Sequence, residues 1–244
     1  MNKFFKPLAL AAGLVFFVPL PAFAADDAPL TVVELFTSQG CSSCPPADKF
    51  LGELAQRHDL LALSVHVDYW DYIGWKDIFA SPENTMRQRR YAQKLGLRYV
   101  YTPQMVIQGA FDSTGSDRAK VLKKIADAKK LDRLAVKISR AGDGVRITIP
   151  AGDIGDPAAV WLAVFDNRHD TEIKRGENSG STLSYYNVVR GMTQIGAWTG
   201  QPLEIVTKAG DMPAQGRDSC VVIVQSLKTG RILGAARLDL GNNN

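Results

Sequence analysis

The stretch TVVELFTSQGCSSCPPADKFLGELA, residues 31–55, decides the fold of this chain. Its apolar first part, residues 31–36, predicts a buried strand, and residues 45–57 predict a helix with a proline-rich entry. Cys41 and Cys44 stand between the two elements, at the N-terminus of the predicted helix. Free backbone N–H groups and the helix dipole favour a thiolate at that place, and the thiolate is the form that attacks disulfides or binds soft metals. The sequence therefore predicts a reactive pair of cysteines.

The first residues have the pattern of a secretory signal peptide. Lys3 and Lys6 precede an apolar stretch at 8–18, and residues 22–24, Ala-Phe-Ala, offer a cleavage site. A retained membrane anchor is the alternative, but the apolar stretch is short for a span. We expect residues 1–24 to be removed and the mature protein to be periplasmic or secreted. No later run is long and apolar enough to predict stable membrane insertion.

Charge and cysteine content restrict the partners and the compartment. The formal net charge is +4, and removal of residues 1–24, which hold two lysines and no acid, lowers it to +2. This charge is too small to predict binding to nucleic acid or to a membrane surface. Three cysteines are too few for a disulfide-stapled scaffold, but an exported protein can keep a persistent or catalytic disulfide.

Residues 25–130 alternate between strand and helix patterns. The continuous apolar run 60–67 predicts a strand buried on both faces. Ser81 followed by Pro82 is typical of a helix start, residues 104–109 predict another strand, and Ser116 or Asp117 caps a further helix. The order β-α-β-α-β-α predicts a layered α/β domain.

Residues 131–244 lose the helical periodicity and show short strand patterns separated by glycine-rich turns. These patterns occupy residues 134–139, 144–149, 159–165, 171–174, 183–190, 203–207, 220–226 and 231–238. Seven or eight short strands in this length predict a second, small all-β domain that resembles a sandwich. Cys220 precedes the apolar run 221–224 and is expected to be a buried, inert thiol.

Thr102-Pro103, immediately before the strand at 104–108, adds to the significance of the cysteine pair. Together with Cys-x-x-Cys at a helix start, this pattern resembles the thioredoxin superfamily over about residues 30–130. The resemblance implies a three-layer thioredoxin-like fold with a cis peptide bond before Pro103. It also implies that Cys41 is the exposed attacking thiol, that Cys44 resolves the mixed disulfide, and that Thr102 and Pro103 shape a substrate groove. The alternative is an ordinary trans turn before a strand.

Glu34 is the candidate proton acceptor, with one difficulty. The resemblance implies a buried acid six residues before the first cysteine, but that position is Leu35 here. A shift of one residue turns a strand side chain to the other face of the sheet. Glu34 can therefore serve only if the loop 37–40 holds one extra residue, and the alternative is that it pairs with a cation.

Residues 68–82 form an aromatic-rich insertion after the central strand. Trp70, Tyr72 and Trp75 are amphipathic aromatics that can line a substrate groove beside the cysteines. The alternative is that they form a small core under the following helix, which is the commoner use of such residues. A basic face follows, which we expect to be solvated; it consists of Arg87, Arg89, Arg90, Lys94 and Arg98.

No metal or other cofactor is predicted. Cys41, Cys44 and His66 have donor atoms that suit Cu(I) or zinc. Their spacing matches no structural zinc pattern, and a second cysteine pair is missing. His66 ends a buried strand and is expected to be a core histidine.

Taken whole, the sequence resembles the bacterial secreted family known as domain of unknown function 1223. Residues 33–48, 66–71, 74–77 and 187–190 carry the resemblance, which covers nearly the whole mature chain. It implies a thioredoxin-like fold and no particular activity.

Two hypotheses of function remain. The first is an exported thiol–disulfide oxidoreductase that acts on protein or small-molecule thiols and disulfides with a redox partner protein. The second is a non-catalytic binding or assembly module, whose cysteines form a structural disulfide or a metal clip. A buried Cys41 without an accessible groove at Pro103 would favour the second.

Overall fold

The computed structural model describes Met1 and residues 29–153, 155, 157–212 and 217–241. The expected signal peptide lies outside these residues, apart from Met1. A search of the described helices finds none with the length and apolar character needed to cross a membrane.

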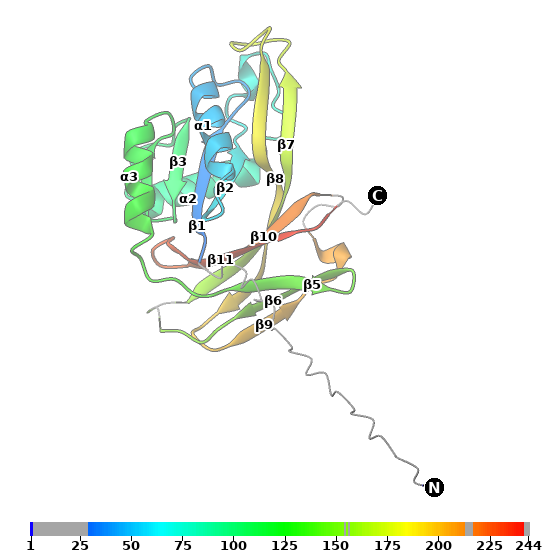
Figure 1. The fold of residues 1–244 in the computed structure, drawn as a ribbon. Coiled ribbons are helices and arrows are strands. Elements are labelled where there is room, and N and C mark those ends of the chain that lie inside the picture. The colour runs from blue at the N-terminus through cyan, green and yellow to red at the C-terminus, as the bar shows by residue number, and fades with distance from the viewer. Residues whose placement is uncertain (2–28, 154, 156, 213–216, 242–244) are drawn as a thin grey trace.

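The described strands form one large mixed sheet of eight strands and a small sheet of three (Figure 1). The order in the large sheet is β11-β10-β7-β8-β2-β1-β3-β4. β1 pairs with β2 in parallel and with β3 in antiparallel register. The strands are β1 (Thr31–Thr37), β2 (Leu60–His66), β3 (Gln104–Ile107), β4 (Phe111–Thr114), β7 (Ala158–Glu172), β8 (Thr182–Trp198), β10 (Ser219–Ser226) and β11 (Ile232–Asp239).

Three α-helices cover the part of the sheet built from β1 to β4. α1 (Pro45–Ala55) and α3 (Arg118–Ala128) pack on one face, where their apolar side chains meet Val33 and Leu35 of β1. α2 (Pro82–Lys94) packs on the other face through Tyr91. Short 3₁₀ turns occupy η1 (Asp71–Ile73) and η2 (Ala209–Asp211).

The starts of two helices follow from their capping residues. The Ser81 hydroxyl accepts a hydrogen bond from the Asn84 backbone N–H at 3.2 Å, so the predicted start of α2 is confirmed. The Asp117 carboxylate likewise accepts from the Lys120 N–H and caps α3.

The small sheet covers the other part of the large one. Its strands are β5 (Lys137–Ala141), β6 (Gly144–Ile149) and β9 (Leu203–Val206). Ile147 and Ile149 of β6 meet β7 and β10 in an apolar core.

The expected boundary between an α/β domain at 25–130 and a separate β-rich domain at 131–244 does not separate two sheets. β8 joins β2 in parallel through Ser64 and Val188, and β7, β10 and β11 continue the same sheet. One core holds Phe36 of the first half beside Phe165 and Ile223 of the second. Local patterns reveal strands but not their partners, because pairing depends on contacts that are distant in sequence.

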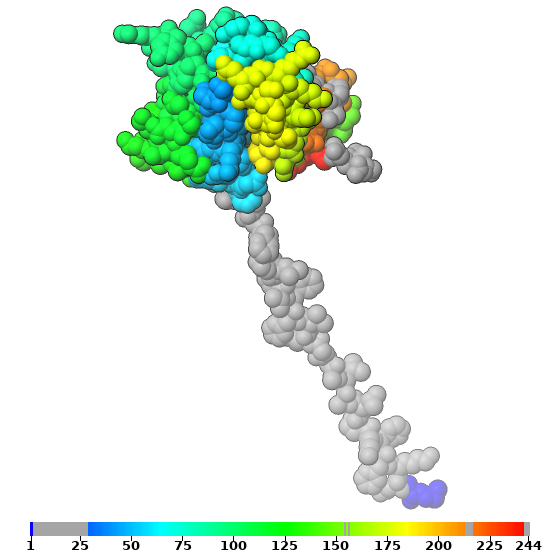
Figure 2. Space-filling model, turned by 90° about the horizontal axis from the view of Figure 1, so that it is seen from above, coloured from blue at the N-terminus to red at the C-terminus, as the bar shows by residue number. Residues whose placement is uncertain are grey.

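β7 and β8 form a ribbon of 15 and 17 residues, longer than the separate short strands expected. Its connecting loop, 173–181, reaches the end of the molecule that holds the cysteines. Figure 2 shows this end, where the yellow residues of the ribbon lie beside the blue residues of β1 and α1. The second half of the chain therefore contributes directly to the surroundings of the cysteines.

Candidate functional site

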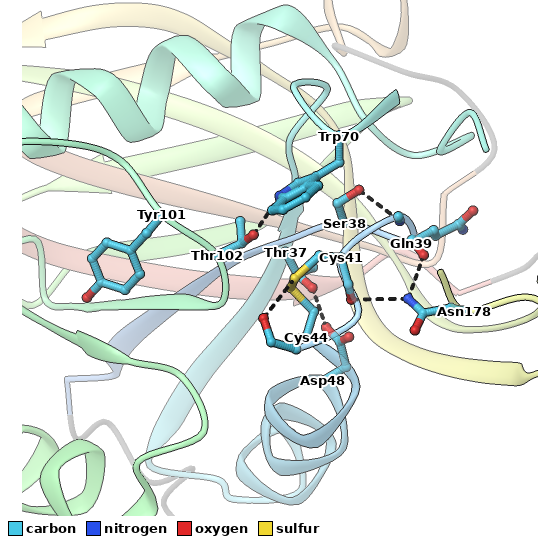
Figure 3. The surroundings of a disulfide bond; sticks show 12 residues. Thr37, Ser38, Gln39, Cys41, Cys44, Asp48, Trp70, Tyr101, Thr102 and Asn178 are labelled. Carbon is cyan, nitrogen blue, oxygen red and sulfur yellow. Dashed lines mark hydrogen bonds between the residues drawn. A yellow bond between two sulfur atoms is a disulfide. The ribbon is translucent and has the colours of Figure 1, made fainter. Parts of the chain in front are cut away.

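Cys41 and Cys44 form a disulfide at the start of α1, with their Cα atoms 5.4 Å apart (Figure 3). Both residues are fully buried, whereas Ser42 and Ser43 between them are exposed. The Cys44 backbone N–H donates to the Cys41 carbonyl, and Pro45 and Pro46 begin the helix. The predicted place of the cysteines between strand and helix is confirmed, but the implied exposure of Cys41 is wrong.

Asn178 from the β7–β8 loop holds the cysteine loop in place. Its side-chain N–H₂ donates to the carbonyl of Gln39 at 2.9 Å and to that of Cys41 at 3.1 Å (Figure 3). Through these bonds, a residue from the second half of the sequence lies against the backbone of Cys41. The sequence does not predict this role for Asn178, because an Asn between two glycines at 176–180 is typical of any turn.

The peptide bond between Thr102 and Pro103 is cis. The Trp70 indole N–H donates to the Thr102 hydroxyl at 2.7 Å, and Pro103 is buried. Trp75 is also half-buried and donates to the Gln39 side-chain oxygen at 2.8 Å. Two of the three predicted groove aromatics therefore contact the segments around the disulfide. The third, Tyr72, is 81 % exposed.

Asp77 ties the aromatic segment to the cysteine loop. Its carboxylate accepts from the backbone N–H groups of Gln39 and Phe79 at 2.8 and 2.9 Å and lies 2.6 Å from His66 Nδ1. Burial opposes ionisation of Asp77, but His66 and these hydrogen bonds outweigh it and lower the pKa of the carboxyl. Asp77 is thus a buried carboxylate whose two oxygens both have hydrogen-bond partners.

Asp48 is a second buried acid near the disulfide. Its environment raises the pKa of its carboxyl, whereas that of Asp77 is lowered. It lies one turn beyond Cys44 on the same side of α1, and its carboxyl accepts from the Thr37 hydroxyl at 2.8 Å (Figure 3). Burial raises the pKa of Asp48 to about 7, and His66 and the Thr37 bond offset only part of this rise. A carboxyl with this pKa can exchange a proton near neutral pH.

Four polar atoms, one on Asp48 and three on strands β2 and β8, are buried without a hydrogen-bond partner among the described residues. They are Asp48 Oδ2, Ser64 Oγ, His66 Nε2 and the Tyr185 hydroxyl. The ring centroids of His66 and Tyr185 are 4.8 Å apart, and Tyr185 interacts electrostatically with Asp48. Buried polar atoms are normally paired, so these unpaired atoms are an exception in the core of the described chain.

Glu34 does not lie with the disulfide. It faces the opposite side of the sheet from α1, where its carboxylate accepts from Arg87 Nε and Nη2 at 2.6 and 3.0 Å and from the Tyr91 hydroxyl. The strand alternation explains this, because Leu35 takes the face toward α1. Glu34 is therefore not placed to be the proton acceptor of the cysteines, and that expectation is corrected. Glu34 instead pairs with a cation, Arg87, which is the alternative stated above. Arg87, expected to be solvated, is 3 % exposed.

Cys220 is expected to resist alkylation in the native protein at pH 8. It is fully buried in β10, and burial raises the pKa of its thiol to about 11, so little thiolate forms. Mass spectrometry after brief iodoacetamide treatment should find it unmodified without denaturant and modified in guanidinium. Labelling of Cys220 under native conditions would contradict the buried placement.

Within the described parts of the chain, no group of three or more His, Cys, Asp or Glu side chains is arranged to hold a metal ion. His66 is a core histidine, as its position at the end of a buried strand predicts.

The solved structures that are similar to this chain include two named proteins. Protein AGR_C_4864 from Agrobacterium tumefaciens, known from a crystal structure, is 36 % identical with a TM-score of 0.79, over 90 % of this chain and 98 % of that one. HBP35 of Porphyromonas gingivalis is 14 % identical with a TM-score of 0.58, over 87 % of this chain and 76 % of that one, and shares the fold alone. No curated protein sequence matches the chain.

The family profile gives the clearest assignment. It matches residues 32–225, which include the cysteine pair, the aromatic segment and the β7–β8 ribbon. The resemblance carried by the sequence motifs is thereby confirmed at the level of the family. The chain belongs to the family described as "Protein of unknown function (DUF1223)".

Proposed function

We propose that this protein is a thiol–disulfide oxidoreductase that uses Cys41 and Cys44. The observation that carries the proposal is a disulfide at a helix N-terminus with a buried carboxyl, Asp48, one turn beyond it and a pKa of about 7. The helix N-terminus favours the thiolate form of a cysteine, and a carboxyl of this pKa can take up the proton that a thiol must lose.

The proposed reaction balances as two exchanges. In the reduced protein, the Cys41 thiolate attacks a substrate disulfide and forms a mixed disulfide, and the first substrate sulfur leaves as a thiolate that takes a proton from solvent. Cys44 passes its proton to Asp48 and attacks the Cys41 sulfur, which restores the Cys41–Cys44 disulfide. The second substrate sulfur leaves as a thiolate and takes up the proton that Asp48 received. The substrate gains two electrons and two protons, and the reverse sequence oxidises a dithiol.

We further infer that residues 30–130 form a thioredoxin-like unit on which the other strands are built. Three features support this: the parallel pairing of β1 and β2 beside antiparallel β3 and β4, helices on both faces, and the cis Thr102–Pro103 bond beside Trp70. A redox role outside the cytoplasm fits the expected signal peptide and the oxidised cysteine pair.

The full burial of Cys41 supports a second candidate, a binding module with a structural disulfide. Asn178 and the aromatic segment cover the cysteine loop, and a substrate disulfide cannot reach a buried sulfur. Under the first proposal, this cover must open before exchange; under the second, it stays closed.

Equilibration with glutathione redox buffers, followed by acid quench, alkylation and mass spectrometry, separates the two candidates. We expect the native disulfide to be reduced reversibly without denaturant and Cys44→Ser to hold one glutathione on Cys41. Cys220→Ser is the matched control and should behave like the wild type. A disulfide that dithiothreitol reduces only after unfolding would refute the oxidoreductase and support the structural disulfide.

A further inference from the structure

A cavity of about 710 Å³ lies between the first turns of α2 and strands β7 and β8, and the proposed redox function does not use it. Its apolar walls include Phe79, Met86, Trp161, Val189 and Met192. A cavity of this size suits a small organic ligand. Val189 and Arg190 belong to the segment 187–190, which is one of the segments that carry the family resemblance.

The cavity carries an excess of positive charge. Arg87 is fully engaged by Glu34, Tyr91 and Gln225 and contributes no free charge. Arg90 is exposed, lies over the Trp161 ring at 5.7 Å, and has no ion pair with any acid in the described chain. Burial and the nearby Arg87 lower the pKa of Arg90, so an anion beside it would be stabilising.

Arg190 is directed to the cavity by a β-bulge. Val164 pairs with Gly191 and Phe165 with Val189, so Arg190 is the extra residue of β8. Its guanidinium lies over the Phe79 ring at 4.9 Å and reaches Asp166 only at 3.4 Å. That one carboxylate also accepts from Arg217 and His169, so it does not neutralise Arg190 alone.

Among the described residues that line the cavity, the acid is Glu83, which is exposed at the start of α2. This one carboxylate at the rim is outweighed by two arginines: Arg90, which has no ion pair among the described residues, and Arg190, which shares Asp166 with Arg217. Guanidinium groups bind carboxylates through paired hydrogen bonds, while aromatic and methionine walls accept an apolar body.

We propose that this cavity binds a small organic carboxylate with an apolar or aromatic body, held by Arg90 and Arg190. The site is separate from the cysteine pair and does not depend on thiol exchange.

Calorimetric titration of the mature protein with 4-phenylbutyrate and its neutral analogue 4-phenylbutanamide tests the proposal. We expect one molecule of the acid to bind per chain and the amide to bind at least about tenfold more weakly, since hydrogen bonds to charged groups are the strong ones. Arg90→Gln should weaken binding of the acid by a similar factor. Arg89→Gln, on the same helix but outside the cavity lining, is the matched control and should leave it unchanged.

Equal binding of acid and amide, absence of binding by both, or an equal loss in the Arg89 and Arg90 variants would each overturn the proposal. Arg190→Gln should add to the effect of Arg90→Gln. Should the loss of its contact with Asp166 unfold that variant, the pair Arg89→Gln and Arg90→Gln decides the question.

Discussion

Replacing Asp48 with asparagine is expected to raise the free energy of unfolding at pH 8 by up to about 4 kcal/mol. The pKa of this carboxyl rises from 3.8 to about 7 on folding, and each unit corresponds to about 1.4 kcal/mol. Asparagine keeps the shape and can still accept the Thr37 hydrogen bond, but it never carries the buried charge. Asp48 is not among the functional residues that the sequence predicts, yet we expect its substitution to have one of the two largest effects.

The pH dependence gives the sign of this effect. The folded state holds the Asp48 proton more tightly than the unfolded chain does. The stability that this proton gives the wild type is therefore lost as pH rises from about 4 through about 7. Wild type and Asp48→Asn should therefore have similar stability at pH 4 and diverge toward pH 8 in urea unfolding of the oxidised protein. A constant difference at all pH values would contradict the assignment.

Asp77→Asn is the matched control, because it lies in the same buried region but has a lowered pKa. Its carboxylate stabilises the fold above the pKa of the unfolded chain, and that stability is lost as pH falls. The substitution removes charged acceptors for His66 and two backbone N–H groups. We expect it to destabilise the protein at pH 8, opposite in sign to Asp48→Asn.

Asp48→Asn also tests the proton transfer in the proposed reaction. Loss of a general base typically costs about 10²-fold or more. The attack of Cys44 on the mixed disulfide should slow by about this factor near pH 7, and the mixed disulfide on Cys41 should accumulate in rapid-quench mass spectrometry. An unchanged rate would exclude Asp48 as the acceptor.

Arg87→Met is expected to destabilise the protein by about 3–5 kcal/mol, because it leaves the Glu34 carboxylate buried without its partner. Both side chains are almost fully buried, and the pair is bidentate. Burial lowers the pKa of Arg87, but Glu34 outweighs it and keeps the guanidinium charged. Urea unfolding at pH 7 measures the effect.

The double variant Glu34→Leu, Arg87→Met should recover most of this loss, since apolar residues can replace a buried ion pair. Glu53 and Arg118 form an exposed bidentate pair between α1 and α3, and Arg118→Met is the control. It should leave unfolding unchanged. A double variant as unstable as Arg87→Met would show that the Arg87 stem and its hydrogen bonds to Tyr91 and Gln225, not the charge, hold this region.

The sequence by itself determined the local structure around the cysteines. Residues 31–55 specify a buried strand, a loop and a helix, and the structure has β1 and α1 in these places. The Ser81-Pro82 start of α2 and the position of the strand after Thr102-Pro103 also follow from neighbouring residues. These features depend on periodicity and capping, which act over a few residues.

Only the tertiary structure decided which strands share a sheet and which acid lies near the disulfide. The strands after residue 131 join the first sheet through Ser64 and Val188, and Asn178 covers Cys41 from 137 residues away. Glu34 and Asp48 are both acids in one short stretch, and each pKa and partner depends on what packs against it. Burial beside Arg87 makes one a paired carboxylate, while burial beside His66 and Tyr185 without a cation of its own raises the pKa of the other. Such contacts join residues far apart in the chain, so local sequence patterns do not contain them.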